Sequence, residues 1–161
     1  MFLKNIKMKE PKPLKRDKAL QPVSHDHHHG LLLCWKIRTG ISKNIPPERM
    51  KNYTDWFFKT HLIPHFGLEE TLLFPILGND HDLIKKALAE HRRLKRLFEA
   101  EFDIIRNLSL IEEELEQHIR FEERILFREI QKLATAEELE LVEQNHTEEK
   151  FLDNTEDEFW K

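Results

Sequence analysis

The sequence predicts an all-α protein, arranged as an antiparallel up-down four-helix bundle with an extended N-terminal arm and a short acidic C-terminal helix and tail. Gly accounts for only 4 of the 161 residues, and charged residues make up 35%. Segments rich in Leu, Glu, Lys and Arg repeat at helical spacing, and no segment alternates polar and apolar residues as a strand does. Long amphipathic helices joined by short connections pack as a bundle.

The chain length suits one compact domain. We expect a basic extended arm over residues 1–22 and a single domain over 23–161, with the four-helix motif region at 24–134. Residues 1–18 carry seven Lys or Arg and two acids, and prolines at positions 11, 13 and 22 favour an extended arm. Because no aromatic residues interleave these cations, the arm is typical of a solvated segment, and we predict no nucleic-acid partner.

Cysteine content and hydropathy give the expected compartment. Cys34 is the one cysteine, which excludes an intramolecular disulfide framework. We find no signal-like segment and no apolar run near the 18 residues of a membrane span. We therefore expect a cytoplasmic protein without membrane contact, and the sequence indicates no particular protein partner.

The first two helices have recognisable boundaries. The first is expected to begin with Ser24 or Asp26 as its N-cap and to stop near Gly40. Two prolines open the second helix, which we place over residues 47–75. Pro64 lies inside it and predicts a bend, because an interior proline removes one backbone hydrogen bond.

The third helix is predicted to begin at Asp80 or Asp82, either of which can serve as its N-cap. Its apolar stripe continues to Ile105. The sequence offers residues 107–109 as the joint to a fourth helix, which we place over 110–133.

The C-terminal region carries two further signals. Thr135 and Glu138 have the spacing of a capping box, which predicts a short acidic helix ending near Asn145. The tail ends in Phe159 and Trp160, which we expect to cover an edge of the bundle.

Two stretches, residues 65–74 and 118–127, are versions of one another, identical at five of ten positions. Each places a histidine four residues before a glutamate and follows them with apolar residues, as His65 with Glu69 and His118 with Glu122. This spacing puts both side chains on one helix face. An unpaired carboxylate on an inward face is costly to bury, so a compensating cation is indicated.

The other two helices supply further imidazoles. His91 lies on the apolar stripe of the third helix, and the first helix carries four histidines within residues 25–29. Aligning the apolar residues of the two helices favours His28 as the equivalent of His91, whereas aligning the acid–histidine pairs favours His27. Four imidazoles and two carboxylates suit two iron or manganese ions with bridging carboxylates.

Simpler interpretations stay open at this point. The histidines and glutamates could form a surface charge pattern or core pairs without metal. His61, one turn before His65, could extend the site or line a ligand pocket. Glu70 and Glu123 lie beside the proposed ligands and are expected to be solvated or to support a ligand histidine.

Taken together, these motifs resemble the hemerythrin-like, or HHE cation-binding, domain over residues 24–134. The resemblance implies a non-haem centre of two iron ions, which manganese or zinc could replace, and a reaction with oxygen, peroxide or nitric oxide in sensing, iron handling or stress response. Carried onto this sequence, its ligand set is His28 or His27, His65, Glu69, His91, His118 and Glu122.

One position departs from the oxygen-carrying members of that family, which have HxxxH on the third helix. Here the fourth residue after His91 is Lys95. The chain is therefore more similar to the bacterial and F-box-associated members than to the oxygen carriers. No catalytic residue stands out beside the ligand set, so we assign no enzymatic activity. The alternatives are an iron- or oxygen-responsive regulatory module and a metal-free helical scaffold.

Overall fold

The computed structural model describes residues 15–146 and 150–161, and these residues form helices and no strand. The all-α prediction is confirmed. The helices are α1 (Gln21–Ser42), α2 (Pro47–Phe57), α3 (Ile63–Leu68), α4 (Phe74–Leu77), α5 (Asp82–Glu99), α6 (Ile104–Phe121), α7 (Phe127–Leu133) and α8 (Ala136–Asn145). Three π-helical turns connect some of them without a break, namely η1 (Phe58–Leu62), η2 (Glu69–Leu73) and η3 (Glu122–Leu126).

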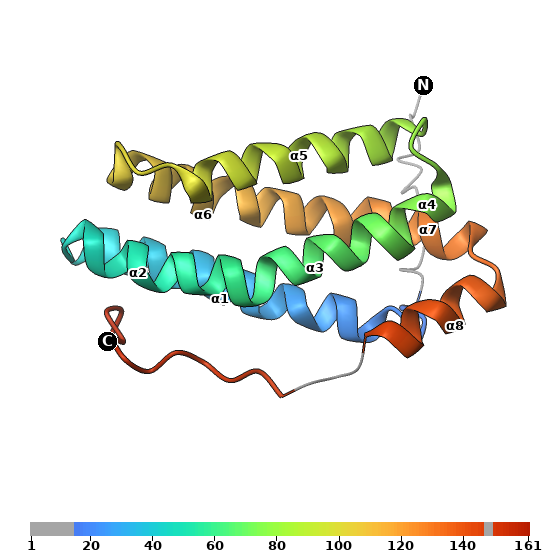
Figure 1. Ribbon diagram of the computed structural model, residues 1–161, viewed down its shortest axis with the longest axis horizontal. Helices are drawn as coiled ribbons and strands as arrows, with labels where there is room; N and C mark the ends of the chain where they lie inside the picture. The colour runs from blue at the N-terminus through green and yellow to red at the C-terminus, as the bar shows by residue number, and fades with distance from the viewer. Residues whose placement is uncertain (1–14, 147–149) are drawn as a thin grey trace, which may run out of the picture.

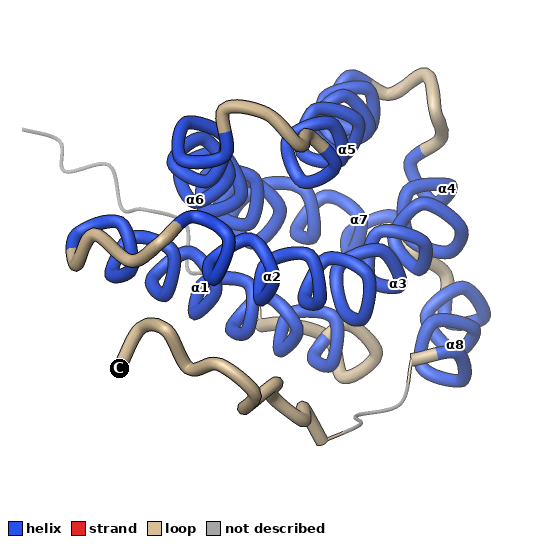
Figure 2. Tube along the Cα trace, turned by 60° about the vertical axis from the view of Figure 1, so that its left-hand side comes forward, coloured by secondary structure: helices blue, strands red, loops and turns tan. Residues whose placement is uncertain are grey.

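The π-helical turns join short helices into longer rods. One rod runs from α2 to α4 and another from α6 to α7, and both lie lengthwise beside α1 and α5 (Figure 1). The most extensive packing is between α1 and α6 and then between α5 and α6. Helix α8 lies at one end, and the C-terminal segment returns along the outside of the rods (Figures 1 and 2).

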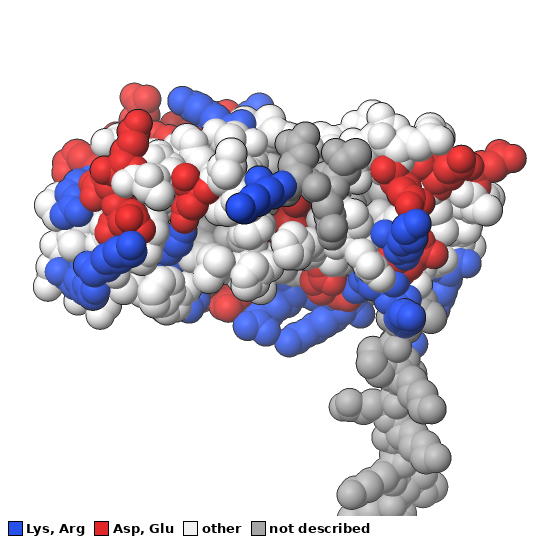
Figure 3. Space-filling model, turned by 90° about the horizontal axis from the view of Figure 1, so that it is seen from below, with Lys and Arg blue, Asp and Glu red and all other residues white. Residues whose placement is uncertain are grey.

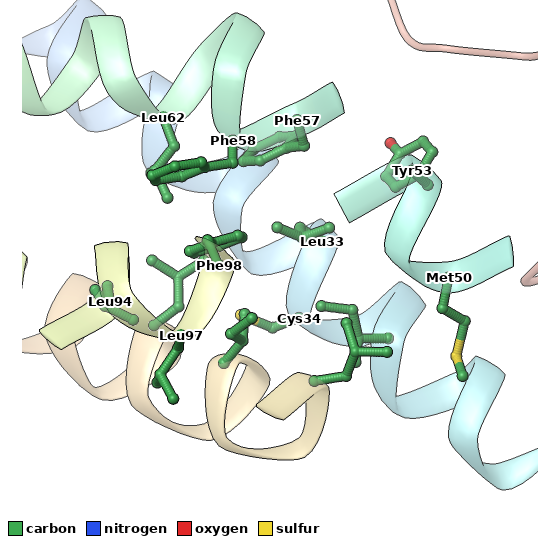
Figure 4. Packing of buried hydrophobic residues seen from close by; sticks show 14 of the residues in the cluster. Leu33, Cys34, Met50, Tyr53, Phe57, Phe58, Leu62, Leu94, Leu97 and Phe98 are labelled. Carbon is green, nitrogen blue, oxygen red and sulfur yellow. The ribbon is translucent and has the colours of Figure 1, made fainter. Parts of the chain in front are cut away.

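The apolar core consists of two clusters. One contains Phe58 and Phe98, whose rings stack with centroids 4.5 Å apart, among the residues drawn in Figure 4. The other contains Phe74 and Phe127. Along each rod, the buried histidines and glutamates described below lie near the boundary between the two clusters.

Helix α1 starts earlier and ends later than expected. It begins at Gln21, with Pro22 in its first turn, rather than at a cap formed by Ser24 or Asp26. The helix continues through Gly40. Here the glycine serves close packing, since a Cβ atom would lie 2.6 Å from Met50 Sδ and 2.7 Å from Phe159 Cε2. The helix ends at Ser42, two residues beyond Gly40, near which the stop was expected.

The joint between α5 and α6 also differs from the prediction. It lies at residues 100–103 instead of 107–109. Asp103 adopts a left-handed conformation with φ of 47°, and the Asn107 side chain donates a hydrogen bond to the Phe102 carbonyl at 2.7 Å. At the start of α5, the predicted aspartate caps are replaced by His81, whose Nδ1 accepts a bond from the Leu83 N–H.

The disturbance expected at Pro64 takes the form of a π-helical turn. Turn η1 comes directly before α3, and Pro64 lies in the first turn of α3, where a missing N–H is tolerated. The rod also continues past the predicted end at Pro75, which lies in the first turn of α4, and ends at Gly78 with φ of 89°.

The C-terminal predictions are confirmed. Both hydrogen bonds of the Thr135–Glu138 capping box are present. Phe159 and Trp160 are buried against the rods, in contact with Tyr53. Asp153 anchors the same segment, because it accepts hydrogen bonds from the Tyr53 hydroxyl and from the buried Lys36 amine. Residues 1–14 of the predicted arm lie outside the described residues.

Charged side chains are mixed in sign on the face of the molecule along which the C-terminal segment runs. Figure 3 shows acidic and basic groups side by side at both ends of the face, in keeping with pairs such as Arg49–Asp157 and Lys18–Glu143. Within the described ranges, none of the helices combines the length and the hydropathy that crossing a membrane requires.

Candidate metal centre

Six polar side chains converge between the two apolar clusters, and all are buried. Both carboxylates, Glu69 and Glu122, are 0% exposed. The four imidazoles come from α1, α3, α5 and α6, as His27, His65, His91 and His118. Each glutamate opens a π-helical turn, a local feature that is frequent at functional sites.

The six side chains form two overlapping groups that could each hold a metal ion. One group contains His27 and His65, the other contains His91 and His118, and both groups include Glu69 and Glu122. Within each group, the four candidate ligand atoms lie within 4.8 Å of one another. The two carboxylates are therefore placed where both groups can use them.

The inner nitrogens of the imidazoles face the carboxylates in pairs. Oε1 of Glu69 lies 3.1 Å from Nε2 of His65 and 3.4 Å from Nε2 of His91. In the same way, Oε1 of Glu122 lies 3.0 Å from Nε2 of His118 and 3.2 Å from Nε2 of His27. Each carboxylate thus lies between one histidine of its own helix and one from another helix.

The outer nitrogens of the same imidazoles each contact a second carboxylate. The Nδ1–oxygen distances are 2.7 Å for His27–Glu123, 3.0 Å for His65–Asp26, 3.3 Å for His91–Glu70 and 2.7 Å for His118–Glu90. A histidine that binds a metal commonly donates its other N–H to a carboxylate, which fixes the tautomer and the ring orientation. With the proton on Nδ1, each ring presents its Nε2 lone pair to the interior.

These outer carboxylates follow the internal repeat of the sequence. Asp26 precedes His27 and supports His65, and Glu90 precedes His91 and supports His118. Glu70 and Glu123 follow the two inner glutamates and support the histidines of α5 and α1. This geometry agrees with the expectation that Glu70 and Glu123 support a histidine of the centre.

Several inner atoms have no hydrogen-bond partner among the described residues. They are both oxygens of Glu69, both oxygens of Glu122, and Nε2 of His91 and His118. A buried polar atom without a partner costs free energy, and natural proteins keep few of them. Cations bound in the two groups would satisfy these atoms, and the mixed imidazole–carboxylate donor set suits iron, manganese or zinc.

The electrostatics of the centre show the same need for positive charge. Burial, and then the neighbouring charge of Glu122, raise the pKa of Glu69 to about 8. Burial alone would raise the pKa of Glu122 as well, but His118 outweighs it and holds that pKa well below its usual range. Burial would lower the pKa of His118, yet Glu122 and Glu90 raise it to about 10. A proton on His118 therefore compensates Glu122 when no metal does.

The preference for His28 as the histidine of the first helix was wrong. His28 is exposed, whereas His27 is buried within the centre. The apolar alignment misled because it equated Trp35 with Phe98, and Trp35 is 49% exposed while Phe98 is 2% exposed. The alignment of the acid–histidine pairs, which matched His27 to His91, correctly identified which histidine of α1 faces the interior.

Other residues singled out from the sequence lie outside the two groups. Lys95 is exposed near Glu99 and does not enter the centre. His61 is not part of either group but lines an adjoining cavity. Asp26 and Glu90 were not predicted as supporting residues. Each of them directly precedes a buried histidine of the centre, His27 or His91, and this pattern could have identified them.

The adjoining cavity has a volume of about 560 Å³ and reaches the centre. His27, His65 and Glu122 form part of its wall. Phe57 and Phe66 provide apolar surface on the same wall. The space is therefore large enough for a small molecule beside the buried imidazoles.

Comparisons of the chain with protein-family models, with curated proteins and with solved structures found no match.

Proposed function

We propose that this chain forms an antiparallel up-down four-helix bundle of the hemerythrin-like type, which holds a non-haem di-iron centre and binds or reacts with a small oxidant. The oxidant would be oxygen, peroxide or nitric oxide. The observation that carries the proposal is the double set of contacts at each histidine. All four imidazoles have a carboxylate on Nδ1 and direct Nε2 at the two buried glutamates.

In this proposal His27 and His65 hold one ion, and His91 and His118 hold the other. Glu69 and Glu122 belong to both groups and would bridge the ions. The bound metals would supply the redox chemistry. The chain supplies orientation through the outer carboxylates and a buried setting between two apolar clusters, which limits access of water.

The cavity provides the space for the oxidant. Its wall includes ligands of the centre and the rings of Phe57 and Phe66, so a small, weakly polar molecule fits its surface. Lys95 stands where the oxygen carriers have a fifth histidine, and it is exposed. This difference favours a sensing or protective reaction over reversible oxygen storage.

Absorption spectroscopy of the iron-loaded protein tests this function. Spectra recorded without oxygen, and then after addition of oxygen, peroxide or nitric oxide, should change in the charge-transfer region. A chain with bound iron whose spectrum stays the same with all three oxidants would contradict the proposed reaction, though not the metal centre itself.

A regulatory function is the second candidate, and one contact favours it. His146, at the C-terminal end of α8, places Nε2 2.8 Å from Oδ2 of Asp26, and the same oxygen lies 3.0 Å from Nδ1 of His65. A change at His65 can therefore reach the end of α8 through a single side chain. Metal occupancy would then alter a surface that includes this acidic helix.

The two candidates differ in what metal removal changes. A ligand that binds only the folded form stabilises it, so both candidates predict a lower Tm for the apoprotein. The regulatory candidate also predicts that removing iron increases amide exchange in α8, and that His146→Ala abolishes this increase. Equal exchange in α8 with and without iron would contradict that candidate.

A further inference from the structure

A second group of histidines lies beside the proposed centre. His25 and His29 are one helical turn apart on α1, and their ring centroids are 5.4 Å apart. The paired rings inside the centre, His27–His65 and His91–His118, have centroids 4.9 Å apart. Two imidazoles bound to one ion at a tetrahedral angle have ring centres about 5 Å apart. The outer pair therefore has a spacing suited to a shared ion.

A third imidazole, His61, lines the same cavity as this pair from another helical rod. His29 and His61 both pack against Phe151, with ring centroids 3.9 Å and 4.5 Å from that ring. His29 Nδ1 and His61 Nε2 are buried atoms with no hydrogen-bond partner among the described residues. Such atoms indicate a missing ligand, because an unsatisfied buried nitrogen is costly.

All three histidines line the cavity that reaches the centre. His25, His29 and His61 are on its wall, whereas His28, an exposed neighbour on α1, is not. The three rings are thus distinguished from the rest of the histidine run by a shared space. Imidazole nitrogen is a preferred ligand of zinc, copper, nickel and iron.

We propose that His25, His29 and His61 form an outer transition-metal site at the cavity, separate from the buried centre. Among the described residues, the groups whose ligand atoms already converge within 4.8 Å are those of the centre. The outer site therefore requires the three rings to turn toward one another, including His25, which is exposed, and it requires Phe151 to move away from His29 and His61. Ordering these side chains costs conformational entropy, so the outer site binds metal more weakly than the centre.

Calorimetric titration with Zn²⁺ tests the proposal on the full chain. A background variant, Glu69→Gln with Glu122→Gln, removes the shared carboxylates of the centre while leaving the cavity histidines unchanged. In this background we expect one Zn²⁺ per chain that depends on the outer histidines, beside any that the four imidazoles of the centre still hold. Adding His29→Ala should abolish that binding, and adding His61→Ala should weaken it by at least about tenfold, the scale of losing a supporting group.

His28→Ala is the matched control, because it removes an imidazole of the same helix that does not line the cavity. A surface chelate made by α1 alone would be weakened by His28→Ala and unaffected by His61→Ala, and that result would overturn the proposal. Retention of the Zn²⁺ ion in the His29→Ala variant would overturn it as well.

The same titration without the glutamine substitutions covers the case in which the background variant does not fold. There, His29→Ala should remove one equivalent of Zn²⁺ and leave the metal of the centre in place. Unchanged stoichiometry would contradict the outer site. A His29→Ala chain that bound no metal at all would contradict an outer site that is separate from the centre.

Discussion

Oε1 of Glu90 on α5 lies 2.7 Å from Nδ1 of His118 on α6, and Glu90 is the residue directly before His91. Asp26 has the same relationship to His65, and it directly precedes His27. One residue of each acid–histidine pair thus supports a histidine of another helix, while the other points into the centre. These two contacts connect α1 with α3 and α5 with α6 beside the proposed metal ions.

Substituting Glu90 tests whether the outer carboxylates matter for metal binding. Glu90→Gln leaves the size of the side chain unchanged but weakens its bond to His118, and we expect a loss of about 10–100-fold in metal affinity. Competition with a chelator measures this loss. Glu99→Gln, on the exposed side of the same helix, is the control and should retain the parent affinity. Equal affinities for both variants would contradict the supporting role.

Gly40 and Gly67 form a matched pair for testing the packing of the C-terminal segment. A Cβ atom at Gly40 would meet Met50 Sδ and Phe159 Cε2 at 2.6–2.7 Å, so Gly40→Ala should destabilise the fold by about 1–3 kcal/mol. At Gly67, which is helical, nothing lies within 4 Å, and Gly67→Ala should stabilise by about 0.5–1 kcal/mol. Chemical denaturation measures both. Equal effects of the two variants would show that Phe159 does not pack against Gly40.

The anchor at Asp153 predicts a pH dependence of stability. Burial alone would raise the pKa of Asp153, but hydrogen bonds from Lys36 and Tyr53 lower it below its usual range. Because the folded pKa is depressed, the stabilisation is fully present above the unfolded pKa of about 3.9 and is lost as pH falls through the folded value. Asp153→Asn should therefore lower the Tm near pH 6 and have progressively less effect below pH 4.

The control for this experiment is Asp157→Asn, which removes an exposed partner of Arg49. Exposed ion pairs contribute little, so the Tm of this variant should stay near that of the parent at each pH. An Asp153→Asn effect that grows as the pH falls would contradict the assigned sign.

The buried histidines and glutamates of two rods were predictable because their pattern is local. A histidine and a glutamate four residues apart, followed by apolar residues, determine one helix face, and the structure places His65, Glu69, His118 and Glu122 together. The joint at residues 100–103 was missed because no Gly or Pro marks it, and the Asn107 bond that helps define it depends on the folded turn. The choice between His27 and His28 depended on the exposure of Trp35, which only tertiary packing decides.

Metal content is the most direct test of the centre. We predict that this chain, loaded with Fe²⁺ under anaerobic conditions and then passed over a desalting column that strips weakly bound ions, retains two iron ions per chain. Because His118 is a proposed ligand, His118→Ala should lose bound iron and have a lower Tm when loaded. Two iron ions per chain in the parent and fewer in the variant would agree with a dinuclear site. Two retained by His118→Ala, or none retained by the parent, would contradict it.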